Sequence, residues 1–185
     1  ERYLGKTIPR NIDEIEKEFK TKTNFDLFKK LEKIKKDFRR EWERLPESIK
    51  KNELEEISIA FTYNTNAIEG STITLEESRE IIHDKIAPNK PLRDIKETEA
   101  HSKVFLNMLN KKEKISEELF LRWHKEIFNE TKPDIAGKYR DYLVRVGDYI
   151  ASDWQEIHKL MKNLVEFINN SKLNPVELSA RTHYK

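Results

Sequence analysis

The sequence predicts an all-α fold with one small β element. Apolar residues recur at steps of three and four along several segments, which is the spacing of one helix face. The 185 residues include only four glycines, too few for the many turns of a β-sandwich or barrel. A single segment, Tyr139–Val146, is rich in β-branched and aromatic residues and predicts a short extended element or hairpin arm.

A long helix is expected in the first quarter of the chain. Its apolar residues form one stripe along about five turns: Leu27, Leu31, Ile34, Phe38, Trp42 and Leu45. Pro46 ends this helix, because proline lacks an N–H and clashes with the preceding turn. Charges around the stripe alternate in sign, which is typical of a solvated face rather than of a phosphate-binding surface. We therefore expect no nucleic-acid partner, although residues 1–52 carry 16 Lys and Arg against 11 Asp and Glu.

Four later helices are marked by polar residues at their expected N-caps: Thr74, Ser116, Asp153 and Asn174. Glu77 completes a capping box with Thr74, and Pro175 follows Asn174 at the first helical position. The helix after Ser116 places Phe120, Trp123 and Ile127 on one face. The helix after Asp153 carries a longer apolar stripe: Ile157, Leu160, Met161, Leu164 and Ile168. These stripes predict a packed helical core.

The two ends of the sequence lead us to expect a piece of a longer protein. The chain begins at Glu1 without a methionine, and no Gly, Asn or Pro ends the last helix before Lys185.

The composition excludes several classes of protein. The chain has no cysteine, which excludes a disulfide scaffold, a zinc ribbon and a thiol nucleophile, and which fits a cytoplasmic location. No apolar run approaches the roughly 20 residues of a membrane-spanning helix, so no membrane partner is expected.

A stretch with a single charge stands out in a chain that is 38% charged. Residues 57–75 contain only Glu69, so we expect this stretch to be buried on most sides. Gly70 is suited to the left-handed position after a helix, which places Glu69 in the last turn, at the negative end of the helix dipole. Thr65 lies four residues earlier, on the same face, where its hydroxyl is able to orient the carboxylate. Two interpretations remain open: a structural ion pair, or a carboxylate held ready for a charged site.

Four motifs in this order resemble the Fic family. The segment Thr65–Gly70 resembles the S/T-x-x-x-E-G/N motif of the inhibitory helix, in the class that carries this helix N-terminal to the core, and Thr74–Ser78 resembles its usual continuation. Ala136–Arg140, followed by Val144–Tyr149, is similar to the family's flap. Asn174–Lys185 resembles the helix that leads into the active site. The resemblance covers about residues 53–185.

The resemblance implies a Fic-like helical bundle with a short β-hairpin flap. Residues 1–52 would be an N-terminal helical extension, and residues 53–185 the N-terminal part of a Fic domain. The inhibitory helix would span about 54–70 and the flap about 138–150. The signature H-P-F-x-D/E-G-N-G-R-x-x-R would begin about five residues after Lys185 and is absent from the sequence. No catalytic residue or metal ligand is therefore assigned, and we expect the 185 residues alone to be inactive.

The family also implies an activity for the whole protein, which is the transfer of AMP from ATP, with Mg²⁺, to a hydroxyl side chain of a target protein. Thr65, Glu69 and Gly70 would be regulatory, because the family's glutamate pairs with the last arginine of the signature and so impairs productive ATP binding. The residues placed beside the nucleotide would be Glu69, Val146, Gly147, Asp148 and Tyr149.

The flap would receive the target as an added strand. The residues implied for the flap and for target docking are Gly137, Arg140, Val144 and Arg145. Arg140 has two interpretations: it anchors the base of the flap by pairing with a carboxylate, or it contacts the nucleotide or the target directly. Residues 1–52 would mediate either target docking or a homodimer.

Two alternatives to AMP transfer remain open at this point. The chain would be a non-enzymatic helical interaction module if Glu69 were only a core ion pair. Within the family, it would alternatively remove AMP from a modified target.

Overall fold

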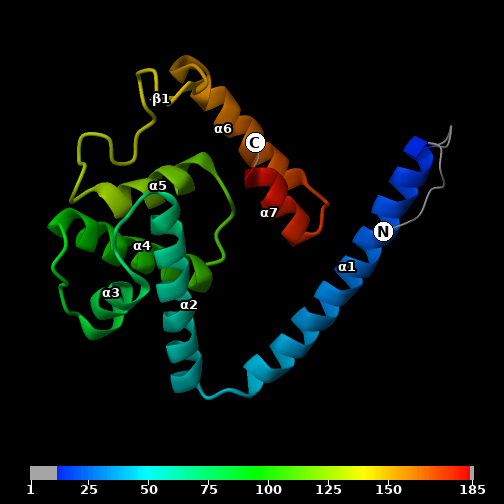
Figure 1. Cartoon of the computed structure of the whole chain (residues 1–185), viewed down its shortest axis with the longest axis horizontal. Helices are drawn as coiled ribbons and strands as arrows, with labels where there is room; N and C mark the ends of the chain where they lie inside the picture. The colour runs from blue at the N-terminus through cyan, green and yellow to red at the C-terminus, as the bar shows by residue number, and fades with distance from the viewer. Residues whose placement is uncertain (1–11, 184–185) are drawn as a thin grey trace. The chain divides into compact units, whose positions relative to one another are not determined.

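The computed structural model describes residues 12–183 (Figure 1). The side chains of residues 12–24 and of Val146 lie outside this description, as do residues 1–11 of the expected extension and Tyr184 and Lys185 of the expected last helix. The chain divides into two compact units, Glu1–Lys50 and Lys51–Lys185. The prediction of a mainly helical fold with one small hairpin is confirmed for the described residues.

The first unit contains the long helix α1, Ile12–Arg44, which ends just before Pro46 as predicted. Phe38 and Trp42 stack on one another with ring centroids 5.6 Å apart. Lys35 pairs with Glu32 across one turn on the exposed surface, at 3.3 Å. The apolar stripe and the alternating charges thus occur on one solvated helix.

Helix α2, Glu47–Ile68, begins directly after Pro46, whose carbonyl accepts the amide of Lys50 at 3.0 Å. It therefore starts earlier than the expected inhibitory helix at residues 54–70, and it contains most of that range. Its buried residues are Ser58, Ile59 and Thr62, and Ile68 is 84% exposed. The expectation that residues 57–75 are buried on most sides is wrong, because only one face of α2 packs against the rest of the unit.

Three elements after α2 build the core of the second unit. They are α3 (Leu75–Arg79), the π-helix η1 (Glu80–Asp84) and α4 (Leu92–Asn110). One apolar cluster gathers buried isoleucines from the α2–η1 region, with Ile95 packed against them: Ile59, Ile73, Ile81 and Ile82. Further buried apolar residues come from α4, α5 and the segment after α5: Val104, Phe105, Leu119 and Ala136.

The predicted caps are present at all four positions. Glu77 N–H donates to Thr74 Oγ1 at 3.2 Å, and Thr74 N–H donates to Glu77 Oε2 at 2.8 Å, which completes the capping box. Ser116 caps α5 (Glu117–Phe128). Asp153 accepts the Gln155 amide at the 3₁₀ turn η2 (Trp154–Glu156), which leads into α6 (Ile157–Asn170). Asn174 accepts the Val176 amide at the start of α7 (Pro175–His183).

The β element is shorter than the predicted one. Strands β1 (Arg145–Val146) and β2 (Tyr149–Ile150) form a two-stranded antiparallel hairpin, with Arg145 opposite Ile150. The first part of the predicted segment, residues 139–144, is not a strand. Its Tyr139 hydroxyl instead donates to Glu117 Oε2 on α5 at 3.2 Å. Packing against a helix thus replaces strand pairing in this part.

No helix within residues 12–183 is long and apolar enough to cross a membrane.

Candidate functional site

Glu69 lies at the C-terminal end of α2, where a Schellman motif closes the helix. Gly70 N–H donates to Ala67 O at 3.1 Å and Ser71 N–H donates to Asn66 O at 2.9 Å. Gly70 has φ +84°, in the left-handed region that favours glycine. The sequence prediction for Gly70 is therefore matched by the backbone, and Glu69 is the residue that caps the helix.

The turn that follows Gly70 is held in place by Lys90. The Lys90 ammonium donates to Thr72 O at 2.7 Å, and it lies 3.4 Å from Glu77 Oε2 of the capping box. Both charged side chains are only about one-fifth to one-quarter exposed. The turn after Glu69 is thus held at one end by the C-terminus of α2. At the other end it is held by Lys90, which also contacts the capping box of α3.

Helix α2 is joined to α4 by a row of polar contacts between small side chains. Ser58 Oγ lies 2.8 Å from Ser102 Oγ, and Asn66 Nδ2 donates to Thr98 Oγ1 at 3.2 Å. Ser58, Thr98 and Ser102 are at most 2% exposed. Buried hydroxyls lose water on folding, so each pair that meets inside the protein also determines which residues face each other. The row therefore sets the register of α2 against α4, and with it the place of Glu69.

Between these contacts, Thr62 Oγ1 meets His101 Nδ1 at 3.0 Å. The imidazole also stacks on Phe61, whose ring in turn stacks on Phe105 with centroids 4.2 Å apart. Burial lowers the pKa of His101 below its ordinary value, so the ring is neutral at pH 7. His101 is thus a structural partner of α2.

A cavity of about 500 Å³ opens beside the end of α2. Thr65, Asn66, Glu69 and Gly70 line one side, and residues from α4 and α5 line the other. Thr65 and Glu69 thus face the same cavity. The Glu69 amide donates to Thr65 O at 3.4 Å, but no side-chain hydrogen bond joins the two in the described residues.

The cations around this cavity already have partners. Lys132 lies 3.0 Å from Glu97 Oε1 and sits over the Phe128 ring, 4.4 Å from its centroid. Arg93 pairs with Asp94 at 3.2 Å. Within residues 12–183, Glu69 is exposed and has no ion pair or side-chain hydrogen bond. Its carboxylate is therefore accessible to a cation from elsewhere.

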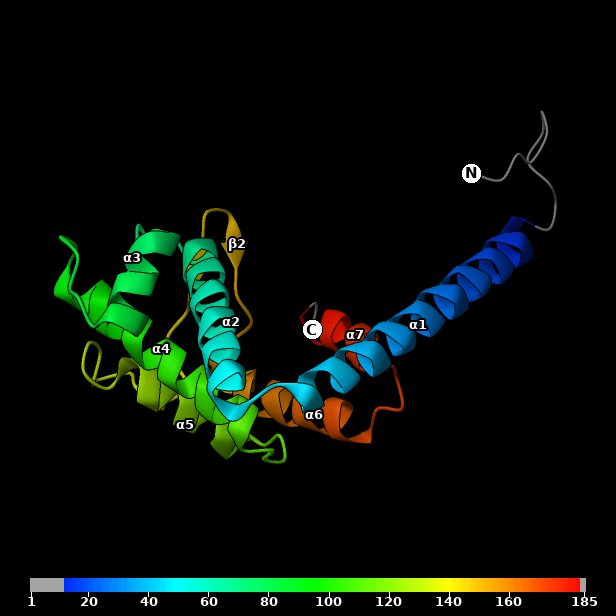
Figure 2. The same cartoon turned by 90° about the horizontal axis from the view of Figure 1, so that it is seen from below.

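The hairpin turn is formed by Gly147 and Asp148. Gly147 has φ +58°, and glycine at the first central position is typical of the type II′ turn that suits a two-residue hairpin loop. Tyr149 and Ile150 on β2 are both more than half exposed. The backbone of β1 and β2 has free outer edges, as expected for a two-stranded sheet. In both views the hairpin lies toward the C-terminal end of α2 (Figure 1 and Figure 2).

Arg140 lies at the base of the hairpin, and its partners are backbone carbonyls. Nη1 donates to Tyr142 O at 2.6 Å, and Nη2 donates to Ser152 O. Within the described chain, no carboxylate pairs with Arg140, so the expected carboxylate partner is replaced by these two oxygens. Val144 O accepts the Ala151 amide at 3.0 Å, one step further along the hairpin.

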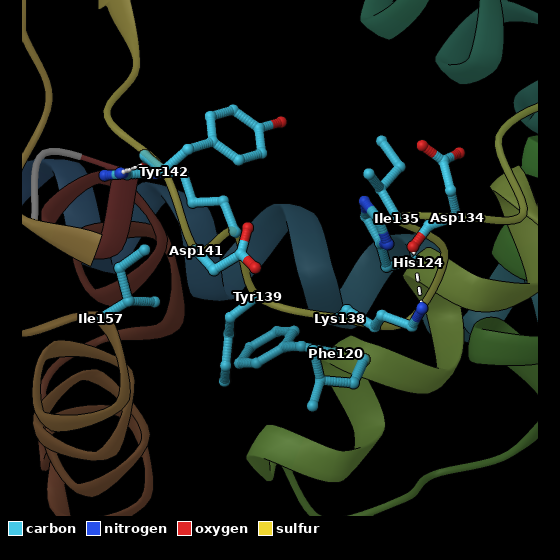
Figure 3. Close-up of a pocket in the computed structure, with 11 residues that line it drawn as sticks. Phe120, His124, Asp134, Ile135, Lys138, Tyr139, Asp141, Tyr142 and Ile157 are labelled. Carbon is cyan, nitrogen blue, oxygen red and sulfur yellow. Dashed lines mark hydrogen bonds between the residues drawn. The ribbon is translucent and has the colours of Figure 1, made fainter. Parts of the chain in front are cut away.

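A second cavity, of about 520 Å³, lies between α5 and the segment that leads to the flap. Figure 3 shows Ile157 of α6 on one side of it and His124 of α5 on the other, with Lys138 bonded to the carbonyl of Asp134 at 2.8 Å. Burial and, after it, the charge of Glu117 raise the pKa of Tyr139 to about 12, so its hydroxyl keeps its proton. Tyr139 is thus a hydrogen-bond donor that ties this segment to α5.

Gly137 is required by its surroundings. Its φ is +73°, and an added Cβ would lie 2.9 Å from Lys125 Cβ. Its amide donates to His124 Nδ1 at 2.9 Å, which makes that nitrogen an acceptor and the ring neutral. Burial and the nearby Lys132 ammonium lower the pKa of His124 in agreement with this. Gly137 therefore allows the backbone before the flap to pack closely against α5, and it precedes the first strand of the hairpin by eight residues.

No sequence pattern predicted α4 or the polar row that it contributes. The signal for a helix was weak there because buried positions are occupied by Thr98 and Ser102, which a search for apolar periodicity does not count. Thr62 and Asn66, on the opposite face of the contact, were missed for the same reason.

The described residues contain no group of three or more His, Cys, Asp or Glu side chains placed to hold a metal ion. The side chain of Val146, one of the residues expected near the nucleotide, lies outside the description.

Comparisons with known proteins agree with one another. Residues 114–185 match the model of the Fic/DOC family. The chain is 29% identical to "Protein adenylyltransferase Fic" of Nematostella vectensis over 143 residues, which cover 73% of this chain and 34% of that protein. It is 28% identical to "Protein adenylyltransferase fic-1" of Caenorhabditis elegans over 141 residues, which cover 71% of this chain and 28% of that protein.

Solved structures show the same likeness. A structure of Fic-1 from Caenorhabditis elegans superimposes with a TM-score of 0.65 at 26% identity, covering 89% of this chain and 51% of that one. A Fic family protein from Desulfovibrio desulfuricans G20 has the same fold, with a TM-score of 0.60 at 23% identity, over 71% of this chain and 41% of that one. The hairpin and helices thus form a mostly helical, Fic-like fold.

The chain spans about a third of the length of the curated relatives that it matches. Its match to the family model includes α5, the hairpin, α6 and α7. Residues 114–185 thus match the Fic/DOC family model, and the chain is similar in sequence and fold to metazoan Fic adenylyltransferases.

Proposed function

We propose that this chain is the regulatory and flap-bearing part of a protein adenylyltransferase that is inhibited by its own Glu69. The reaction would transfer AMP from ATP to a hydroxyl group of a target protein. The hydroxyl oxygen attacks the α-phosphorus, the bond from that phosphorus to the bridging oxygen of pyrophosphate breaks, and the hydroxyl proton passes to a base. We assign neither the base nor the phosphate-binding groups to a residue of this sequence.

The observation that carries the proposal is the state of Glu69. Its carboxylate is exposed beside a cavity at the end of a helix, in a position set by the polar row to α4, and it has no partner in the described residues. A carboxylate at the C-terminal end of a helix meets the negative end of the helix dipole, which disfavours it by about 0.3–1 kcal/mol. An arginine that approached this cavity would relieve that repulsion and would form a charge-assisted hydrogen bond. Such an arginine would then be unavailable to a phosphate group of ATP.

Thr65 and Gly70 support this role in different ways. Gly70 permits the tight turn that ends α2 at Glu69, because its φ of +84° is strained for any other residue. Thr65 lines the same cavity one turn before Glu69, so it is placed to contact whatever group enters there.

The hairpin supports the other half of the proposal. An extended segment of a target would pair with a free edge of β1 or β2, as in recognition by strand addition. A target segment docked in this way would lie beside the turn residues Gly147 and Asp148 and beside Tyr149. The nucleotide contacts of Val146, Gly147, Asp148 and Tyr149 remain predictions, as do the docking roles of Gly137, Val144 and Arg145. A homodimer also remains a prediction.

ATP is the nucleotide that the family implies, and Mg²⁺ would accompany its phosphates. Since no suitable group of metal-binding side chains occurs within residues 12–183, we assign no ligand for Mg²⁺ and no step to it.

The test follows the fate of differently labelled ATP in the whole protein. The protein is incubated with ATP labelled on the α-phosphate or, separately, on the γ-phosphate, and the label bound to protein is measured. AMP transfer predicts incorporation of the α label alone. Incorporation of the γ label would instead indicate phosphate transfer. Release of AMP from a previously modified acceptor, with no incorporation of either label, would show AMP removal. If neither label is incorporated and no AMP is released, an interaction module would be favoured. Incorporation of the γ label, release of AMP without incorporation, and the absence of any of these reactions would each contradict the proposal.

A further inference from the structure

The hairpin is too small to be stable by its own pairing. Each strand has two residues, and only Arg145–Ile150 and Val146–Tyr149 face each other in the ladder. An isolated two-stranded hairpin of this size is at best marginally stable in water. Its side chains contribute little burial, because Tyr149 is 68% and Ile150 53% exposed. Something at its base must therefore keep the two arms together.

Arg140 has the geometry for this task. Its guanidinium donates one N–H to Tyr142 O on the arm before β1 and another to Ser152 O on the arm after β2. A guanidinium is planar and carries five donors in a rigid fork, so it can bind two carbonyls at once. The only other contact described near the base is the 3.0 Å hydrogen bond from the Ala151 amide to Val144 O.

The surroundings of Arg140 leave it free for this role. No carboxylate competes for the guanidinium in the described residues, although Asp141 is its neighbour in sequence. Arg140 also lines the second cavity, beside α5, and a further cavity of about 480 Å³ that includes residues of α6. Its side chain thus stands where the flap leaves the helical body.

We propose that Arg140 is a positioning residue that clamps the two arms of the flap together. Without the clamp, the arms separate at Tyr142 and Ser152 and the strand edge is no longer held in one place. The proposal rests on the proposed function in one respect only: that edge is the surface on which a target segment docks. The clamp itself is a property of the chain that can be measured without any reaction.

The first test measures the clamp directly by hydrogen exchange in the whole protein. In R140A, the Ala151 amide should exchange about tenfold faster than in the wild type, because local opening no longer has to break the two arginine bonds. Amides inside α5 and α6 should exchange as in the wild type. The R140K variant separates the clamp from mere charge. A lysine ammonium lacks the fork that spans two carbonyls, so R140K should resemble R140A.

The matched control is R122A, which removes an arginine from α5. The two charged partners of Arg122, Glu113 at 2.5 Å and Glu126 at 3.8 Å, both lie outside the flap segment. Its loss should leave the Ala151 amide unchanged. Wild-type exchange at Ala151 in R140A, or a full return to wild-type exchange in R140K, would overturn the clamp.

The second test asks whether the clamp positions an acceptor. In a protein with the E69G change, two reactions of ATP compete. A protein hydroxyl attacks the α-phosphorus and becomes bound to AMP, or water attacks it and free AMP is released. Pyrophosphate leaves in both reactions. Water needs no flap. R140A should therefore lower the ratio of protein-bound AMP to free AMP about tenfold, whereas general destabilisation lowers both products together.

The two tests separate the two claims. Faster exchange in R140A with an unchanged product ratio would retain the clamp and refute its role in docking. No AMP product from the E69G protein would contradict the proposed function, and the exchange result would still decide the clamp.

Discussion

Thr62 Oγ1 on α2 lies 3.0 Å from His101 Nδ1 on α4, and this contact joins the helix that ends at Glu69 to the core of the second unit. The threonine is fully buried, and the imidazole stacks on Phe61. The position of Glu69 thus depends on a hydrogen bond between two polar side chains. Protonation of His101 or loss of the Thr62 hydroxyl would disturb this bond, whereas a purely apolar contact would not depend on either.

The first prediction concerns the pH dependence of stability. Burial lowers the pKa of His101 below its ordinary value of 6.5, so the unfolded chain binds a proton at a higher pH than the folded one does. The stabilising effect is complete above the ordinary pKa and is lost as the pH falls from about 6.5 through the lowered folded value. Urea unfolding between about pH 8 and pH 5 should show this loss.

The control for this pH effect is H101N, whose amide does not titrate and is able to hydrogen-bond with Thr62. Its stability should fall less steeply over the same range. The remaining slope should include His124, whose pKa is also lowered by burial and by Lys132. Equal slopes in H101N and the wild type would contradict the assignment to His101.

The second prediction concerns the partner of His101. Thr62→Val keeps the shape of the side chain but removes its hydroxyl, which leaves Nδ1 without its bond inside the protein. The free energy of unfolding should fall by about 1–3 kcal/mol. The matched variant is Thr65→Val, one turn later, where the hydroxyl makes no hydrogen bond in the described residues. Its effect on stability should stay within about 0.5 kcal/mol. Urea unfolding followed by tryptophan fluorescence measures both.

The third prediction compares two glycines that have similar φ angles. Gly70 has φ +84° and open space around the position of a Cβ, whereas Gly137 has φ +73° and would place a Cβ 2.9 Å from Lys125 Cβ and 3.2 Å from Leu121 O. Gly70→Ala should therefore cost only the backbone strain, about 1 kcal/mol. Gly137→Ala should cost about 3 kcal/mol, since a clash with α5 is added. Equal losses in urea unfolding would show that the approach of Gly137 to α5 is not as close as described.

Local signals in the sequence predicted much of the helical framework. The N-caps at Thr74 and Ser116 and the left-handed Gly70 depend on neighbouring residues alone, so a short stretch of sequence is enough to find them. The end of α1 before Pro46 belongs to the same class of signal.

Features that depend on partners far along the chain were not predictable in this way. The contact of α2 with α4 uses buried hydroxyls such as Ser58 and Ser102, which are 44 residues apart and give no apolar stripe. The low charge of residues 57–75 suggested burial, but Ile68 shows that an uncharged helix face can remain in solvent. The partners of Arg140 are carbonyls, which any residue supplies, so no sequence pattern identifies them.

The most direct test of the inhibitory role of Glu69 is the rate of AMP transfer in the whole protein under saturating ATP and Mg²⁺. Wild type, E69G and E69Q are compared, with E76Q as a control that removes an exposed charge from α3. We expect E69G and E69Q to modify themselves at least about tenfold faster than the wild type, which corresponds to the loss of about 1.4 kcal/mol of competing interaction. E76Q should match the wild type. Equal rates of self-modification in the wild type and both Glu69 variants would contradict the account.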